Sequence, residues 1–348
     1  MLMNGLAGII YGGFMDKRAF EKLIDACREK DIVYIQTHNY PDPDAIASAY
    51  GFQKLLEFYG IESKICYVGR NDKISTRKIF ETFDVDIFSY DSLLSELKED
   101  SFIILVDSQK EGGNVTDIIG QEIATIDHHP QANKIKYLYK DIRIVGSCCT
   151  LITEYYTEMG VPLTTEVASL LLYGLKMDTL QLTRGVTELD IKMYYHLFLR
   201  SSSELVSRLE KNTLELNDLK AFSDVITNIR VFGRLGYAKI DFDCPDAIIA
   251  ATCDFILSMN EIDFAVVYAI RSDGIKFSVR SEIENVPAGS ITKAALDGLG
   301  NGGGHSFMAG GLIPTENISQ LGDDIDGAII EKFDSVLTKL GFINSSDT

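Results

Sequence analysis

An imidazole and two carboxylates lie within seven positions of one another near the start of the chain. The segment 37–48 reads THNYPDPDAIAS and follows a short apolar run, DIVYIQ, at 31–36. This order places His38, Asp42 and Asp44 on the loop that leaves a predicted buried strand. Imidazole nitrogen combined with carboxylate oxygen can bind a divalent cation, so the segment is a candidate metal site.

Two further polar clusters follow apolar runs of the same kind. Asp107 comes directly after the run FIILV, and Asp127, His128 and His129 come directly after the run IATI. Ligands of open α/β sheets gather at the carboxyl ends of the strands, so we expect these side chains to lie together. Asp178, at the end of a helical pattern, is a further candidate.

Together these residues predict a site for two divalent ions. Two ions about 3.5–4 Å apart can make a nucleophile from water at neutral pH and neutralise a phosphate ester. Asp107 stands alone at its strand end, so we expect its carboxylate to bridge the ions. The mixed oxygen and imidazole ligands favour Mn²⁺, with Mg²⁺ as the alternative, over a thiolate zinc site.

Several of these residues also have a purely structural explanation. Asp42 is suited to cap a helix that begins at Pro43. Asp107 suits a turn at a strand end, and Asp178 suits a solvated helix end. Two adjacent histidines in a core are harder to explain, since both imidazoles rarely find partners there. The recurrence of such clusters at successive strand ends favours the metal site.

The elements that would position these residues alternate between strands and helices. The helix after the first strand begins with Asp42 as its N-cap and ends at Gly60. Continuous apolar runs are typical of strands buried on both faces, and β-α-β alternation predicts an α/β fold with a doubly wound, mostly parallel sheet. Strands are predicted at 31–36, 63–68, 102–106 and 123–126.

The second half of the chain changes from consecutive helices back to strands. Asp273 and Gly274, between two of these strands, predict a hairpin. A helical connector between two domains is expected to start at Ser201. The predicted helices are 164–177, 187–200, 204–222 and 247–259, and the predicted strands are 235–241, 264–271 and 274–281.

A glycine-rich segment near the C-terminus, 298–305, reads GLGNGGGH. We predict a turn that enters a helix, because the free backbone N–H groups of such a turn can bind an anion. Arg280, at the end of a predicted strand, would add a fork-shaped phosphate donor. A flexible loop and an ordinary surface arginine are the alternatives.

Composition limits the classes of partner. The chain has 348 residues, enough for about two domains, and 46% of them are hydrophobic. A net charge of −18 repels long nucleic-acid backbones but leaves small phosphorylated ligands admissible once divalent metals are bound.

Cysteine usage and hydropathy point to the cytoplasm. The six cysteines show no C-x-x-C spacing and are expected to be reduced thiols of a cytoplasmic protein. Residues 1–14 have no basic n-region and are too short to span a bilayer, so we expect a leader and no signal peptide, with Met15 as an alternative start. No other segment approaches transmembrane length, so no membrane partner is predicted.

With these residues in place, the chain resembles the DHH phosphoesterase family, which is named after the triplet Asp127-His128-His129. Within the family it is most similar to the nano-RNase and 3′-phosphoadenosine-5′-phosphate (pAp) phosphatase group of RecJ-like proteins. The resemblance covers residues 31–312 and implies a DHH catalytic domain at 1–200, a connector at 201–223 and a smaller DHH-associated α/β domain with a mixed sheet at 224–342. Four motifs carry it in order: HNYPDPDA from His38, VDS from Val106, DHHP from Asp127 and DT from Asp178.

The resemblance implies a role for each matching residue. Asp127 would orient an imidazole, and His129 would act on the scissile phosphate beside the bridging Asp107. One metal would be held by His38, Asp42 and Asp107, and the other by Asp44, Asp107, His128 and Asp178. The substrate clamp of the DHH-associated domain would comprise Arg280, Ser281, Gly302, Gly303, Gly304 and His305.

The implied activity is Mn²⁺-dependent hydrolysis of short oligoribonucleotides or pAp by a homodimer. A phosphodiesterase of cyclic dinucleotides or their linear products is the rival, and a non-catalytic nucleotide sensor or a nucleic-acid module stands behind it. RecJ-type exonucleases call for basic channels with stacking aromatics, and family pyrophosphatases and polyphosphatases lack the glycine-rich clamp.

Three departures from the family pattern bear on specificity. Ala47 stands where the first motif has glycine. After Asp178 and Thr179 the chain continues LQLTR, where the family has glycine and an aromatic. The stretch 282–300 is longer than expected. These differences concern the substrate more than the metals.

Overall fold

The computed structural model describes residues 15–69, 74–211, 214–216, 218–304 and 306–342. The expected leader, 1–14, and the clamp residue His305 therefore lie outside the described residues. The chain divides into two compact units, Met1–Thr213 and Leu214–Thr348, and each is described by itself. No described helix is both long and apolar enough to cross a membrane.

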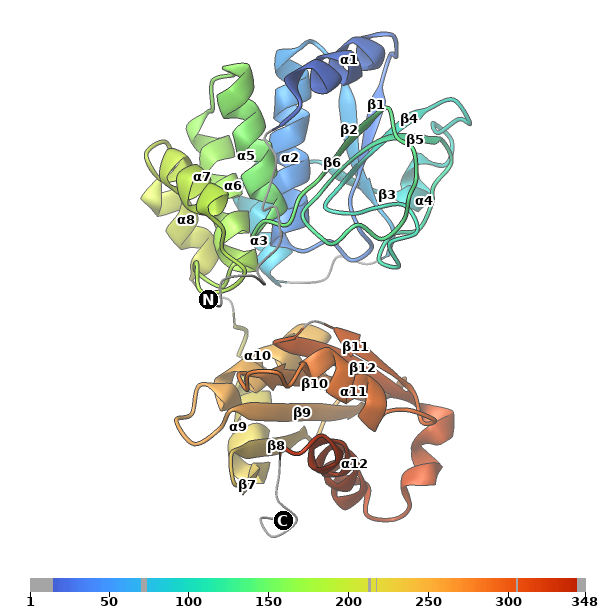
Figure 1. Cartoon of the computed structure of the whole chain (residues 1–348), viewed down its shortest axis with the longest axis vertical. Coiled ribbons are helices and arrows are strands. Elements are labelled where there is room, and N and C mark those ends of the chain that lie inside the picture. Colours follow the sequence, from blue (N-terminus) through green and yellow to red (C-terminus); the bar gives the residue numbers. More distant parts are fainter. Residues whose placement is uncertain (1–14, 70–73, 212–213, 217, 305, 343–348) are drawn as a thin grey trace, which may run out of the picture. The chain divides into compact units, whose positions relative to one another are not determined.

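Six parallel strands form the sheet of the first unit, in the order β3-β2-β1-β4-β5-β6 (Figure 1). This confirms the predicted doubly wound parallel sheet, in which the order of successive strands reverses between β1 and β4. The short outer strands β3 and β6 were not predicted. The strands are Val33–Gln36 (β1), Ser63–Tyr67 (β2), Ile87–Ser89 (β3), Phe102–Val106 (β4), Gln121–Asp127 (β5) and Tyr139–Ile142 (β6).

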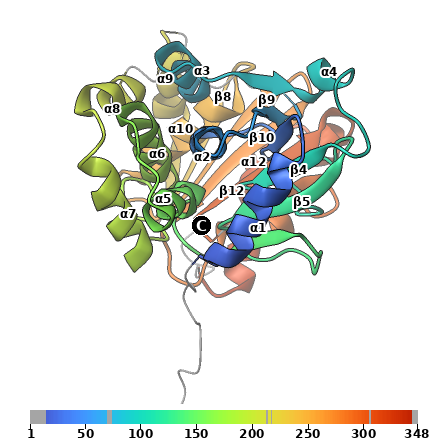
Figure 2. The same cartoon turned by 90° about the horizontal axis from the view of Figure 1, so that it is seen from above.

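Helices α2, α5, α6, α7 and α8 of the first unit lie beside one another. α2, α5 and α6 run side by side (Figure 1), and α7 and α8 lie next to them when the molecule is seen from above (Figure 2). The helices are Lys17–Arg28 (α1), Pro43–Phe58 (α2), Ile74–Thr82 (α3), Tyr90–Leu93 (α4), Cys148–Met159 (α5), Thr165–Asp178 (α6), Glu188–Phe198 (α7) and Ser203–Glu210 (α8).

The two faces of this sheet pack on different elements, because successive side chains of a strand point to opposite sides. Val33 and Ile35 of β1 lie in a large core that includes α1, α2, α5 and α6. Tyr34 lies in a smaller core with Leu93 and Leu97. Both faces are therefore buried, which explains the continuous apolar runs of the central strands.

The second unit contains a mixed sheet in the order β11-β12-β10-β9-β8-β7, in which β8 and β9 pair in parallel and the other neighbours are antiparallel. Helices α9 and α10 pack on one face, and α11 and α12 on the other. The predicted hairpin is confirmed, since Arg271 pairs with Gly274. The strands are Arg230–Phe232 (β7), Leu235–Ile240 (β8), Phe264–Arg271 (β9), Gly274–Ser281 (β10), Asn301–Gly304 (β11) and Met308–Pro314 (β12), and the helices are Asp218–Asn228 (α9), Asp246–Leu257 (α10), Ala288–Ala295 (α11), Thr315–Leu321 (3₁₀) and Ile325–Lys339 (α12).

The single helix predicted at 204–222 is wrong. It is two helices, because Lys211 leaves α8 with an extended backbone and the Asp218 carboxylate accepts a hydrogen bond from the N–H of Glu215 at the start of α9. Of the residues assigned to the connector, those in α8 pack on α6 in the first unit, and those in α9 pack on β8 in the second.

The glycine-rich turn predicted to enter a helix is also wrong. Asn301–Gly304 is instead an edge strand, β11, paired antiparallel with β12 and following helix α11. The glycines allow this strand to approach the helix closely: a Cβ at Gly302 would lie 2.9 Å from the carbonyl oxygen of Thr292. Pattern alone could not distinguish a glycine turn from a glycine strand under a helix.

Candidate metal centre

The predicted ligands of the first unit come together at the carboxyl ends of the central strands. β1 pairs in parallel with β4, and β4 with β5, so the residues that follow these strands emerge at one edge. His38 follows β1, Asp107 follows β4, and His128 follows β5. This edge includes the reversal between β1 and β4, where open α/β sheets bind their ligands.

Helix α2 brings Asp42 and Asp44 to the same edge. Asp42 is the N-cap of α2, and its Oδ1 accepts a 3.0 Å hydrogen bond from the N–H of Ala45. The same oxygen lies 3.9 Å from Nε2 of His38. The cap and a ligand role are therefore compatible, and the structural explanation of Asp42 does not compete with the functional one.

Asp107 lies between two imidazoles. Its Oδ2 is 3.6 Å from Nε2 of His38, and its Oδ1 is 3.3 Å from Nε2 of His128. The side chain is buried, and the backbone of Asp107 has a left-handed φ of 57°. Such a conformation is costly for a residue other than glycine and is often found at functional sites.

Both imidazoles present the same nitrogen to the centre. Nδ1 of His38 donates a 2.7 Å hydrogen bond to the carbonyl of Asn39, and Nδ1 of His128 donates one of 3.0 Å to the carbonyl of Val145. When Nδ1 carries the proton, a neutral ring has its lone pair on Nε2. The backbone thus orients both rings for metal binding.

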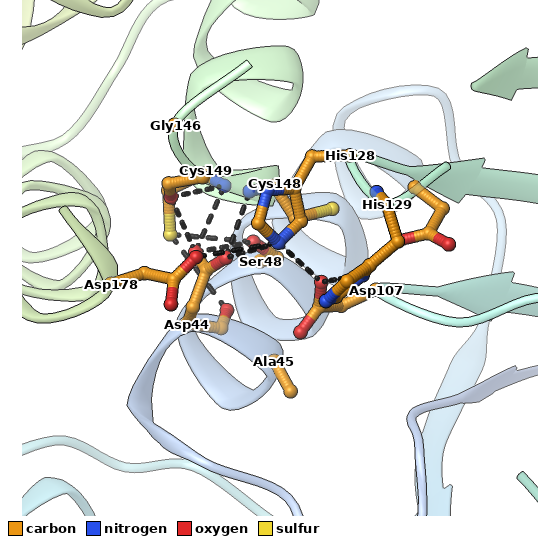
Figure 3. A network of polar contacts seen from close by, with 12 residues as sticks. Asp44, Ala45, Ser48, Asp107, His128, His129, Gly146, Cys148, Cys149 and Asp178 are labelled. Carbon is orange, nitrogen blue, oxygen red and sulfur yellow. Dashed lines mark hydrogen bonds and ion pairs between the residues drawn. The ribbon is translucent and has the colours of Figure 1, made fainter. Parts of the chain in front are cut away.

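Nε2 of His128 faces three carboxylates. It lies 3.3 Å from Oδ1 of Asp107, 3.3 Å from Oδ2 of Asp178 and 3.9 Å from Oδ2 of Asp44 (Figure 3). These groups come from β4, α6 and α2. The structure therefore places Asp178, which lies at a helix end and in the fourth motif of the resemblance, beside the residues that follow the strands.

The carboxylate of Asp44 is held by the beginning of α5. Its Oδ1 accepts hydrogen bonds from the hydroxyl of Ser147 at 2.6 Å and the N–H of Cys149 at 3.0 Å. Its Oδ2 accepts one of 2.8 Å from the N–H of Cys148 (Figure 3). The positive end of the helix dipole favours the charged carboxylate and fixes its direction.

His129 is oriented by Asp127. Nδ1 of His129 donates a 2.8 Å hydrogen bond to Oδ1 of Asp127, whose other oxygen accepts one of 2.7 Å from the side-chain amide of Gln109. The side chain of His129 is 35% exposed, against 11% for His128. His129 is therefore the more accessible imidazole of the pair.

Several carboxylates lie close together in the site, and their burial and mutual repulsion shift the pKa values of the groups there. Burial, together with the charge of Asp44, raises the pKa of Asp107 to about 6. Burial and the charge of Asp44 also raise the pKa of Asp178, to about 7. Burial lowers the pKa of His128, but the charges of Asp107, Asp44 and Asp178 outweigh it and leave that pKa well above its ordinary value.

The pKa values of His129 and Asp127 are shifted in opposite directions. Burial lowers the pKa of His129, but the hydrogen bond to Asp127 outweighs it and the net pKa is raised. Burial raises the pKa of Asp127, but the hydrogen bonds from His129 and Gln109 outweigh it and the net pKa is lowered. The pair therefore favours a charged imidazole on an ionised carboxylate.

The residues present fit two divalent cations. Three groups of ligand atoms lie close enough to hold an ion: His38/Asp42/Asp107, Asp44/His128/Asp178 and Asp107/His128/His129. The buried Oδ1 of Asp107 accepts no hydrogen bond from the described residues, although it faces His128. A buried carboxylate with raised pKa and an unused oxygen requires a positive partner, and a cation provides one.

Sequence reasoning missed the residues that hold the ligands. Ser147 had a usable signal, since a serine directly before an apolar run is typical of an N-cap. Gln109 stands two residues after Asp107 and had none. Asp190 is fully buried and accepts hydrogen bonds from the N–H of Gly146 and the hydroxyl of Thr150, so it ties α7 to the start of α5.

The segment after Asp178 has an unusual backbone. Leu180, Gln181 and Leu182 have left-handed φ values of 45°, 58° and 66°. The guanidinium of Arg184 donates a 2.6 Å hydrogen bond to the carbonyl of Asp178 and lies 3.5 Å from its Oδ1. The departure from the family pattern in this segment therefore forms a strained turn against a candidate ligand.

The clamp residues predicted in the second unit lie at the end of β10 and in β11. Nε of Arg280 donates a 2.5 Å hydrogen bond to Asp254 of α10, and the arginine side chain is 12% exposed. Ser281 is buried, and its hydroxyl has no hydrogen-bond partner among the described residues. Gly302, Gly303 and Gly304 belong to β11, which β12 separates from β10 in the same sheet.

Each unit of the chain matches the model of a known domain family. The model of the DHH family N-terminal domain matches residues 32–175, and that of the DHHA1 domain matches residues 233–331. The chain is 26% identical over 289 residues to an uncharacterized protein of Methanocaldococcus jannaschii; the match covers 82% of this chain and 59% of that protein, so the chain spans less than two thirds of this relative.

Two other similarities cover most of this chain and most of the protein it is compared with. The chain is 24% identical over 302 residues to a probable manganese-dependent inorganic pyrophosphatase of Streptococcus pyogenes, covering 79% of this chain and 92% of that one. An exopolyphosphatase-related protein from Bacteroides fragilis shares the fold with a TM-score of 0.75 at 18% identity, covering 93% of this chain and 96% of that one. With a DHH N-terminal domain that carries the candidate metal centre and a DHHA1 domain after it, the chain belongs to the DHH family.

Proposed function

We propose that this protein is a two-metal phosphoesterase that hydrolyses short oligoribonucleotides, pAp, or both. The sharing of Asp107 carries the proposal, since one carboxylate oxygen faces the His38 group of ligands and the other faces the His128 group. His38, Asp42 and Asp107 would hold one cation, and Asp44, Asp107, His128 and Asp178 the other. The manganese dependence in the name of the Streptococcus relative supports Mn²⁺ as the metal.

Two divalent cations held by these residues would neutralise the phosphate and would lower the pKa of a bound water molecule, which supplies a nucleophile at neutral pH. The protein's own residues supply the remaining chemistry. Asp44 and His128 are fixed by the start of α5 and by the carbonyl of Val145, so they need no reorganisation. The buried surroundings of Asp107 strengthen every charge interaction there.

His129 is the proposed proton donor to the leaving oxygen. Asp127 accepts the hydrogen bond of Nδ1, which leaves Nε2 as the nitrogen available to a substrate. The raised pKa of His129 keeps the ring protonated closer to neutral pH than a free histidine. The carboxylate of Asp127 stabilises that charge and holds the ring plane.

The second unit would supply the preference for nucleotides. Arg280, Ser281, the glycines of β11 and His305 are the proposed substrate-binding residues. The guanidinium of Arg280 is pre-oriented by Asp254. The hydroxyl of Ser281 is buried and has no hydrogen-bond partner among the described residues, so its use by a ligand would require the surrounding side chains to move. A bare phosphate chain would not need these groups.

The proposed setting is the cytoplasm. All six cysteines are buried free thiols, which suits a reducing compartment. The proposed partners are the short nucleotide and a second copy of the chain. Long nucleic acids are disfavoured by the net charge of −18.

Hydrolysis of pyrophosphate is the second candidate, because one relative is named as a pyrophosphatase. A Mn²⁺-dependent assay can separate the candidates with a panel of pAp, di- to pentaribonucleotides, linear and cyclic dinucleotides, and pyrophosphate. Asp107→Asn is the matched control, since asparagine tolerates the left-handed backbone and removes the charge. We expect turnover of pAp or short RNA that Asp107→Asn abolishes. Turnover confined to pyrophosphate, or to cyclic dinucleotides and their linear products, would refute the assignment to pAp and short RNA.

A further inference from the structure

One aromatic side chain lies within the first metal-binding segment and has no part in the ligand set. Tyr40 is two residues after His38 and two residues before Asp42, which belong to one ligand group. Its side chain is 59% exposed. The ring therefore lies beside the ligand group without being part of the core.

The backbone of Tyr40 is strained. Its φ is 55°, in the left-handed region that bulky residues avoid, and the next residue is a proline, which restricts the preceding backbone further. Glycine or asparagine would adopt this conformation more easily. Strain of this kind persists only where the surroundings impose it, and it gathers at ligand sites.

Hydrogen bonds on both sides of Tyr40 impose this conformation. The N–H of Tyr40 donates to the carbonyl of Val68 at 3.2 Å, and the N–H of Asn39 donates to the carbonyl of Asn114 at 2.7 Å. The side chain of Asn39 also exchanges hydrogen bonds of 2.9 and 3.1 Å with Thr116. The loop is therefore tied to the segments that follow β2 and β4, the two strands on either side of β1.

The ring itself is supported from one side. A Cβ at Gly69 would lie 2.9 to 3.1 Å from three carbons of the Tyr40 ring, so the ring packs directly on the glycine backbone. No larger residue fits at Gly69 without moving the ring. One side of the Tyr40 ring therefore packs on the backbone, and most of the ring is exposed. We call this ring the aromatic platform.

We infer that Tyr40 determines specificity by stacking on the nucleobase of a substrate whose phosphate lies at the metal centre. The inference rests on the proposed function and narrows it to phosphoesters that carry a base. An aromatic face binds every base, so the platform selects nucleotides over pyrophosphate without selecting a sequence. Two residues span at most about 7 Å, which is comparable with the reach from a 5′-phosphate to its base.

A tryptophan at this position can report the contact directly, because the natural chain contains no tryptophan. Tyr40→Trp should lose fluorescence when the Mn²⁺-loaded protein is titrated with AMP and keep it with ribose 5-phosphate. Phe58→Trp is the control, since Phe58 is 56% exposed and lies at the far end of α2, roughly 24 Å along the helix from Asp42. Equal quenching of both tryptophans by AMP would overturn the inference.

Binding constants separate a stacking role from a structural one. The unmodified protein and Tyr40→Phe should bind AMP about 10–100-fold more tightly than ribose 5-phosphate. Tyr40→Asn, which suits the backbone and lacks the ring, should bind the two equally, with its affinity for ribose 5-phosphate unchanged. Equal or absent binding of both ligands by the unmodified protein, or equal weakening of both by Tyr40→Asn, would overturn the inference.

This experiment also distinguishes the inference from the proposed function, because it measures binding and not turnover. A protein that prefers AMP and hydrolyses no nucleotide would refute the proposed activity and keep the role of Tyr40. A protein that hydrolyses pAp and shows no preference for the base would do the reverse.

Discussion

Ser147 and Asp44 are separated by 103 positions, and the hydroxyl of Ser147 donates a 2.6 Å hydrogen bond to Oδ1 of Asp44. Ser147 is also the N-cap of α5, accepting a hydrogen bond from the N–H of Cys149. One hydroxyl therefore links the cap of a helix to a candidate metal ligand. Helix α5 contributes none of the candidate ligands, but its first residues orient the carboxylate of one of them, Asp44.

We predict that Ser147→Ala weakens Mn²⁺ binding about 10–100-fold, because an outer hydrogen bond to a ligand is lost. The lost cap should also lower the free energy of unfolding by about 1 kcal/mol. Calorimetric titration with Mn²⁺ and urea unfolding of the metal-free protein measure the two effects.

Ser202→Ala is the control for this prediction. Ser202 caps α8 in the same unit and contacts no candidate ligand. It should show a similar loss of stability and unchanged Mn²⁺ affinity. Equal Mn²⁺ affinities of the two variants would contradict the role assigned to Ser147.

The sequence predicted correctly where β1 and β4 end, because central parallel strands are apolar throughout. FIILV is β4, and Asp107 follows it as expected. What a single sequence could not predict was which helix end approaches which strand end. The contacts of Asp44 with the start of α5, and of Asp178 with His128, are long-range and leave no local pattern.

Local sequence patterns gave wrong predictions where the same composition is compatible with two different structures. The glycines at 302–304 suit both a turn and a strand under a helix, and only the packing on Thr292 decides between them. The stretch 204–222 has helical character throughout, and its division follows from the separate packing of α8 and α9.

Because the turn after Asp178 is strained, we predict that relieving the strain raises the stability of the protein and lowers its affinity for Mn²⁺. Leu180 is 49% exposed with a φ of 45°, so Leu180→Gly should stabilise the metal-free protein by about 0.5–1 kcal/mol through relief of the left-handed conformation. The loosened turn should hold Asp178 less firmly and lower Mn²⁺ affinity. Urea unfolding and Mn²⁺ titration test both effects.

Leu138→Gly provides the comparison for that prediction. Leu138 is 51% exposed and is not among the described residues with positive φ. Glycine there should destabilise the protein by about 1 kcal/mol, without a change in Mn²⁺ binding. Destabilisation by Leu180→Gly would show that the turn is not strained.

The pKa shifts predict how stability depends on pH. The folded-state pKa values of Asp107 (about 6) and Asp178 (about 7) lie above the ordinary value of 3.8, and those of His128 and His129 are also raised. A group whose pKa is raised by folding binds its proton more tightly in the folded state. Its contribution to stability is therefore lost as the pH rises through the folded value.

The metal-free protein should accordingly lose stability as the pH rises from about 4 to above 7. Asp127, whose pKa is lowered, acts in the opposite sense and only near or below its ordinary value of 3.8. Mn²⁺ competes with these protons, so the rise in Tm on adding Mn²⁺ should grow over the same range. A metal-free Tm that increases from pH 5 to pH 7.5 would contradict this account.

Arg280 is predicted to act on substrate binding. Arg280→Gln should raise KM for pAp or short RNA about tenfold to hundredfold with little change in kcat, because a charge-assisted contact to phosphate is lost. Arg271→Gln is matched, since Arg271 is paired with Asp246 and Asp273 in the same hairpin. Steady-state kinetics of both variants decide the matter; equal KM values would remove Arg280 from the substrate site.

The central claim is that Asp107 is shared between two metal ions. The direct measurement is the number of Mn²⁺ ions bound per chain, with electron paramagnetic resonance to detect spin coupling between them, in the unmodified protein and in Asp107→Asn. We predict two coupled ions in the unmodified protein and no coupled pair in the variant. A single bound ion in the unmodified protein, or an intact coupled pair in Asp107→Asn, would contradict the account.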